Sequence, residues 1–153
     1  MKKFVAVLLA AVLCLSFASC GGEKATDKTV DAAAMFKALL NDVTYTDNAT
    51  ELDSSMAGVL LGGELPDGTE AYLAANDSAY LRCAVFACKD KDAAAAVKKL
   101  IQTYIDDSID AKYNVDEVAL LQNAKIHSMG NYVAVAVTSD TDNVNKVIDQ
   151  YFA

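Results

Sequence analysis

The cysteines and the single histidine are the residues of this chain best suited to covalent chemistry or to metal binding. Four cysteines occur, at positions 14, 20, 83 and 88. Cys83 and Cys88 fall within one predicted strand, five residues apart, so their side chains point to opposite faces about 16 Å from each other. That separation exceeds the reach of a disulfide or of a shared metal ion. We therefore expect two free thiols, with Cys83 as a small core residue.

His127 lies in a predicted strand in which Ile126 faces the core and His127 faces the other way. No cysteine or second histidine stands at metal-ligand spacing from it. The neighbouring Ser128 points to the opposite face, so it cannot act together with the imidazole. We expect His127 to be a surface residue, and we expect the chain to have no catalytic residue, no metal site and no cofactor.

Two acidic pairs, Asp90 with Asp92 and Asp140 with Asp142, suggest calcium binding at first sight. The second pair begins like a calcium loop, but Val144 occupies the next ligand position and no glutamate closes the loop. Each pair comes directly before a predicted helix, where aspartate is favoured as the N-cap. We therefore expect helix capping at both places instead of metal binding.

Composition and charge limit the class of protein. The chain has 153 residues, of which 54% are hydrophobic and 8% aromatic, enough for one domain with a proper core. It carries 13 basic and 21 acidic residues, a net charge of −8. A surface this acidic repels phosphate backbones, and no run of lysine or arginine forms a basic patch. Nucleic acid is therefore excluded as an expected partner.

The first 19 residues have the order of a secretory signal peptide. Lys2 and Lys3 form a basic start, residues 4–15 (FVAVLLAAVLCL) are apolar, and the small residues Ala18 and Ser19 follow. The apolar run is shorter than the roughly 20 residues that a membrane-spanning helix needs. We expect residues 1–19 to be cleaved off during export.

The stretch Phe17-Ala18-Ser19-Cys20 resembles the lipobox of bacterial lipoproteins. The resemblance implies that Cys20 becomes the first mature residue and carries a lipid with acyl chains such as palmitate; two chains suffice for stable anchoring. Residues 20–29, which begin Cys-Gly-Gly, would then be the lipid anchor and a flexible tether. The expected location is the extracytoplasmic side of the cell membrane. Two alternatives stay open, a secreted protein cleaved near Ser19 and an uncleaved signal anchor.

Residues 30–153 are predicted to form a single α+β domain, an antiparallel sheet of about four strands with helices on at least one face. One or two extra helices precede two units, each a β-hairpin followed by a helix, and a short helix over 113–122 connects the units. The predicted helices span 30–41, 56–61, 91–108 and 143–152, and the predicted strands span 70–75, 79–88, 124–128 and 131–138.

The two helices that follow the hairpins share one apolar spacing, at positions i, i+3, i+4 and i+7. This spacing is typical of a helix that buries one face. The residues concerned are Val97, Leu100, Ile101 and Tyr104 in the first helix, and Val144, Val147, Ile148 and Tyr151 in the second.

One face of the sheet is a candidate interaction surface. If Leu81, Cys83 and Val85 pack under the helices together with Val133, Val135 and Val137, the opposite face carries aromatic and small residues. Such a face is unusual when left bare to water, so it could bind an envelope protein or a ligand. Its candidate residues are Tyr80, Arg82, Phe86, His127 and Tyr132. The alternative is that the helices at 30–41 and 54–61 cover this face.

The segments AVFACKDKDAAAAVKKLI and NAKIHSMGNYVAVAVTSDTDNVNKVI, together with the lipobox, resemble small lipoproteins of clostridia and related gut Firmicutes that carry a domain of unknown function. The resemblance implies export, lipid anchoring and a Gram-positive envelope, and it implies no activity or cofactor. We expect an envelope-anchored, non-enzymatic binding or accessory module. The alternatives are a small-ligand or ion sensor, and an enzyme whose site is assembled from residues distant in sequence.

Overall fold

The structure is a computed structural model that describes residues 29–111 and 114–153. The predicted signal peptide, the anchor residue Cys20 and the predicted tether up to residue 28 lie outside the described residues. The described part of the chain forms five strands and five helices. Within this part, no helix has the length and apolar character needed to cross a membrane.

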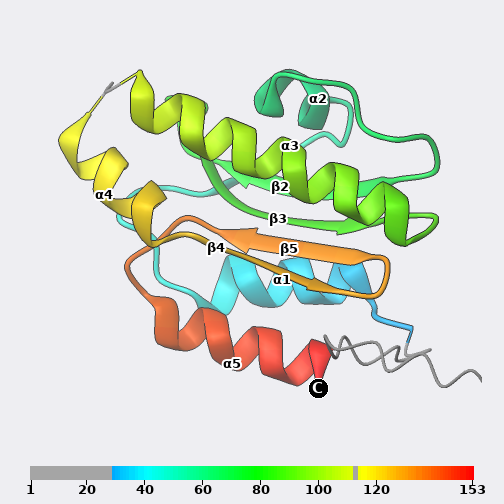
Figure 1. Cartoon of the computed structure of the whole chain (residues 1–153). Helices are drawn as coiled ribbons and strands as arrows, with labels where there is room; N and C mark the ends of the chain where they lie inside the picture. The colour runs from blue at the N-terminus through cyan, green and yellow to red at the C-terminus, as the bar shows by residue number, and fades with distance from the viewer. Residues whose placement is uncertain (1–28, 112–113) are drawn as a thin grey trace, which may run out of the picture.

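A single antiparallel sheet forms the middle layer of the molecule (Figure 1). Its strands are β1 (Thr50–Leu52), β2 (Glu70–Ala75), β3 (Leu81–Ala87), β4 (Lys125–Met129) and β5 (Tyr132–Ala136). They lie in the order β1-β2-β3-β5-β4, so β3 is central and β1 and β4 are the edges. Both predicted hairpins, β2–β3 and β4–β5, are present, and the antiparallel arrangement is confirmed.

The predicted number of about four strands is wrong, because β1 adds a fifth strand at the edge. Residues Thr50–Leu52 pair with β2 inside a polar segment in which no strand is predicted. An edge strand needs hydrogen bonds on one side only, and of its three side chains only Leu52 is half-buried. The apolar alternation that indicates a strand is therefore missing from this segment.

The five helices cover both faces of the sheet (Figure 1). They are α1 (Ala32–Asp42), α2 (Met56–Leu61), α3 (Lys91–Asp110), α4 (Val115–Asn123) and α5 (Thr141–Phe152). Helices α1 and α5 pack together on one face, and α3 lies with α2 and α4 on the other. The two hairpins thus send the helices that follow them to opposite faces, and the molecule has three layers.

Local sequence explains where the helices begin and end. α1 begins at Ala32 because the side chain of Asp31 accepts a hydrogen bond from the backbone N–H of Ala34 at 2.9 Å. α2 ends at Gly62, whose φ of 73° lies in the left-handed region that glycine adopts without strain.

The alternation of side chains along β3 is interrupted by a bulge at Arg82. Cys83 pairs with Ala74 of β2, but the next β2 residue, Ala75, pairs with Leu81, so Arg82 has no partner residue on β2. One extra residue on a strand shifts every later side chain to the other face. Leu81 therefore packs on the α3 side, whereas Cys83 packs on the side of α1 and α5.

The pairing of β3 with β5, together with the bulge that turns Leu81 away from Cys83, makes the predicted division of the sheet faces wrong. Val85 pairs with Ala134 under α1 and α5, and Phe86 pairs with Val133 under α3. Cys83 and Val85 therefore share a layer with each other but not with Val133.

The buried faces predicted for the two long helices are confirmed, since each contributes its spaced apolar residues to a core layer. These buried residues are Val97 and Ile101 of α3, and Val144, Val147 and Ile148 of α5.

Candidate functional site

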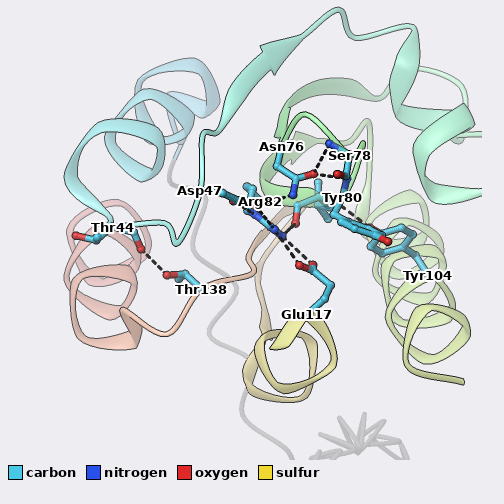
Figure 2. A network of polar contacts seen from close by, with 10 residues as sticks. Thr44, Asp47, Asn76, Ser78, Tyr80, Arg82, Tyr104, Glu117 and Thr138 are labelled. Atoms are coloured by element: carbon cyan, nitrogen blue, oxygen red, sulfur yellow. Dashed lines mark hydrogen bonds and ion pairs between the residues drawn. The ribbon is translucent and has the colours of Figure 1, made fainter. Parts of the chain in front are cut away.

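The largest fully buried side chain in the described residues is that of Arg82, at the bulge of β3. Only 1% of this side chain is exposed, and it lies between Asp47 and Glu117 (Figure 2). Nε and Nη2 donate to the two oxygens of Asp47 at 2.7 and 2.9 Å, and Nη1 and Nη2 donate to the two oxygens of Glu117 at 2.8 and 2.9 Å. Nη1 also donates to the carbonyl of Leu81 at 3.2 Å. All five N–H groups of the guanidinium are thereby used.

The two carboxylates come from segments that are far apart in the chain. Asp47 lies in the connection between α1 and β1, and Glu117 lies in the first turn of α4. The Asp47 side chain is 40% exposed and the Glu117 side chain 9%. Asn76 adds a third contact, because its amide donates to Asp47 at 2.6 Å while its carbonyl accepts from the backbone N–H of Tyr80 at 2.8 Å.

Hydrogen bonding within the cluster shifts the pKa values of its members. The hydrogen bonds from Arg82 lower the pKa of Asp47 to about 2, although partial burial opposes the shift. Burial alone would lower the pKa of Arg82, but the hydrogen bonds to Asp47 and Glu117 outweigh it and raise that pKa. Arg82 and Asp47 are therefore both charged over the whole physiological range of pH.

A pocket of about 460 Å³ opens beside this cluster. It is lined by Thr46, Asp47, Arg82, Asn114, Asp116, Glu117, Ala119, Leu120 and Ser139. The donors of Arg82 are already bound to the protein's own carboxylates, and Asp47 is too acidic to serve as a general base near neutral pH. The arrangement ties the connection after α1 and the start of α4 to the centre of the sheet, and we assign it a structural role.

The residues predicted to form an interaction face do not share one. Phe86 is fully buried in the layer under α3, and Arg82 is buried between its two carboxylates. Tyr132 and His127 lie half-buried on the side of α1 and α5, and Tyr80 lies half-buried after the β2–β3 turn. The predicted single face is wrong because the pairing of β3 with β5 places Phe86 and Tyr132 on opposite faces, and because helices cover both faces. The alternative holds in part, since α1 covers one face and α2 helps to cover the other.

His127 occupies the strand position predicted for it, with Ile126 facing the α3 layer and His127 facing the other side. It is half-buried and not a fully exposed surface residue. Burial lowers the pKa of its imidazole, Lys125 lowers it further, and Asp149 of α5 opposes the shift. The ring is therefore neutral at pH 7.

Cys83 and Cys88 are free thiols, as predicted, and they are buried in opposite core layers. Burial raises the pKa of Cys83 to about 11 despite a hydrogen bond with Tyr45, and burial also raises the pKa of Cys88. Because the thiolate is the reactive form, both side chains are poor nucleophiles at neutral pH.

The acidic pairs before α3 and α5 differ from each other. Asp90 caps α3 as predicted, accepting a hydrogen bond from the backbone N–H of Ala93 at 2.8 Å. Asp140 stands at the N-cap position of α5, but its carboxylate accepts from the backbone N–H of Thr44 and the amide of Asn143, both at 2.9 Å, so the predicted capping bond is absent there. Within residues 29–111 and 114–153, no three His, Cys, Asp or Glu side chains are grouped so as to hold a metal ion.

The cluster around Arg82 was not among the predicted sites, although the chain contains one signal for it. Arg82 is the only arginine, and it interrupts an otherwise apolar strand. A guanidinium in a buried strand requires carboxylate partners. Both partners lie 35 residues away, one on each side, in segments with many other acids, so the sequence does not indicate which acids they are.

One protein-family model matches part of this chain. No curated protein and no solved structure matches it. Residues 66–138, from the turn before β2 to just beyond β5, match the family model described as Domain of unknown function (DUF4358).

Proposed function

We propose that this protein is a lipoprotein anchored through Cys20 to the extracytoplasmic side of the cell membrane, where its folded domain acts as a non-enzymatic binding or accessory module. The observation that carries the proposal is the sequence Phe17-Ala18-Ser19-Cys20-Gly21-Gly22 directly after a basic start and an apolar run. A cysteine at this place, followed by two glycines, provides an acylation site and a tether.

The start of the folded domain fits a tethered anchor. The first helix begins at Ala32, with Asp31 as its cap. The segment between Cys20 and this cap contains ten residues, from Gly21 to Val30. Ten residues span at most about 35 Å when fully extended. A lipid on Cys20 would therefore keep the domain close to the membrane surface.

The state of the reactive side chains supports binding over catalysis. Burial keeps the thiols of Cys83 and Cys88 protonated, and the guanidinium of Arg82 is fully bonded to groups of the protein itself. His127 is neutral, and it lies on the side of the sheet that α5 covers. The polar cluster of the domain thus stabilises its own fold.

Detergent partitioning and intact mass test the anchor. The full chain, expressed in a bacterial host, should enter the detergent phase and show the mass of a mature protein that begins at Cys20 and carries acyl chains. Cys20→Ala should lose both properties. Cys14→Ala removes the other cysteine of the N-terminal region and should keep both, which makes it the matched control. An unmodified protein found in the aqueous phase would rule out the lipoprotein.

A further inference from the structure

An apolar groove lies between β1, α2 and the turn that joins β2 to β3. Its volume is about 470 Å³, and it is lined by Leu52, Met56, Val59, Leu60, Ala75, Asn76, Asp77 and Ala79. Met56 is 42% exposed and Val59 is 73% exposed, and these are two of the three large apolar side chains exposed in the described residues. The third, Val115, lies on α4.

The groove borders an edge of the sheet. β1 is the last strand on its side, and no described strand pairs with its outer edge. In an antiparallel ladder, alternate residues point their backbone N–H and C=O groups away from the partner strand. Such an edge can accept one more strand, and Leu52 connects it directly with the groove.

The segments that form this edge carry charge of one sign. Residues 38–81 contain no lysine, arginine or histidine and eight acidic residues, all of them exposed. Glu51 and Asp53 stand on either side of Leu52, and Asp77 lines the groove itself. Asp47 is ion-paired with Arg82, which leaves a strongly negative edge around an apolar depression.

We propose that the β1 edge and this groove bind an extended peptide segment in which basic and apolar residues alternate, so that the segment adds a sixth strand to the sheet. Backbone hydrogen bonds along β1 would provide affinity. An apolar side chain would enter the groove beside Val59, and the alternate basic side chains would meet Glu51 and Asp53 on the opposite face. The inference rests on the proposed binding role and is independent of the lipid anchor.

Charge argues against two other occupants. A second copy of this chain would bring an equally acidic β1 edge against the first, and like charges placed opposite each other oppose strand pairing. An anionic lipid surface would be repelled by the same carboxylates. A basic partner gains from both the apolar groove and the surrounding charge.

The test uses the full chain in a neutral detergent and a fluorescent octapeptide of alternating lysine and valine, with binding measured by anisotropy. We expect saturable binding that weakens as salt is raised. Val59→Lys places a like charge in the groove and should weaken binding by roughly tenfold or more. Val115→Lys makes the same change at a position that is 85% exposed on α4, and it should leave binding unchanged.

A second set of peptides tests strand addition itself. N-methylation of alternate residues removes backbone donors from one edge of the peptide at a time, so one methylated register should lose binding and the other should keep it. The Cys20→Ala variant should bind the unmodified peptide as the parent does, which separates this inference from the anchor.

Four results would overturn the proposal: no binding at millimolar peptide, equal binding of a glutamate–valine octapeptide, equal loss in Val59→Lys and Val115→Lys, or equal loss in both methylated registers. Sedimentation showing a dimer that Val59→Lys dissociates would also overturn it, because the occupant would then be a second copy.

Discussion

Arg82 determines how three separate segments of the chain meet. Its guanidinium is buried at the bulge of β3, and bidentate pairs connect it to Asp47 and Glu117. A buried charge that loses its partner destabilises a protein by several kcal/mol. The connection after α1 and the first turn of α4 are therefore fixed to the sheet by electrostatics as well as by packing.

The two carboxylates should contribute unequally to stability. Glu117→Gln keeps the side-chain shape but removes the better buried charge, and we expect the free energy of unfolding to fall by about 3 kcal/mol. Asp47→Asn should reduce it by only about 1 kcal/mol, because solvent screens a carboxylate that is 40% exposed. Urea denaturation of both variants at pH 7 measures the difference. Equal losses would show that burial does not set the strength of these pairs.

Acid provides a further test of the Asp47 pair. The pKa of Asp47 is lowered to about 2 from its ordinary 3.8, so the unfolded chain binds this proton more readily than the folded protein does. Its stabilisation is complete above the ordinary pKa and is lost as the pH falls towards 2. Asp47→Asn should therefore lose less stability than the parent between pH 4 and pH 2.

At the scale of single elements, the turn between β2 and β3 holds a residue in an unfavourable conformation. Ala79 has φ of 62°, in the left-handed region that residues other than glycine seldom adopt. The side chain of Asn76 maintains the turn by accepting hydrogen bonds from the backbone N–H groups of Ser78 and Tyr80. The backbone cost at Ala79 is thus offset by local hydrogen bonds.

Replacing Ala79 by glycine should stabilise the domain. Glycine removes a steric cost of about 1–2 kcal/mol and adds chain entropy to the unfolded state, leaving a net gain of about 0.5–1 kcal/mol. Gly130→Ala is the converse control: its φ is 58° and an added Cβ meets no atom within 4 Å, so only the backbone cost applies. Urea midpoints should shift in opposite directions, and a shift in the same direction would contradict this account.

Elements with a strong local pattern could be predicted from the sequence. The β4–β5 hairpin is indicated by Gly130-Asn131 between alternating strands, and α3 and α5 are indicated by their apolar spacing. The bulge at Arg82 has no such pattern, because the residues around it read as one continuous apolar strand. β1 also lacks such a pattern, since a three-residue edge strand buries little side-chain area.

The Arg82 cluster could be predicted only in part. The sequence shows that a charged residue interrupts a buried strand, which requires a partner. Its position relative to the sheet depends on the bulge, and its partners depend on tertiary folding that brings together residues 35 positions apart. If the bulge is overlooked, regular alternation assigns Arg82 to the same face as Phe86. This is the error of the prediction from sequence.

At the scale of the whole molecule, two core layers share one sheet. Cys83 lies in the layer under α1 and α5, and Cys88 lies in the layer under α3. Because β3 contributes side chains to both layers, neither layer can open far without disturbing the other. We expect the domain to unfold as one cooperative unit.

Thiol labelling tests this cooperativity. In a full chain carrying Cys14→Ala and Cys20→Ala, only the two buried thiols remain. Neither should react with an alkylating reagent in the native state, and both should become reactive at the same urea concentration, giving species with no label or two labels by mass spectrometry. A populated species with one label would show that the layers open separately.

The position of Arg82 midway between its two partners also sets an order of events in time. During synthesis, which starts at the N-terminus, Asp47 is made first, Arg82 second and Glu117 third. Until Glu117 arrives, closing the sheet would trap a cation with half of its neutralising charge missing. The charge of the buried guanidinium can therefore be fully neutralised only after α4 has been synthesised.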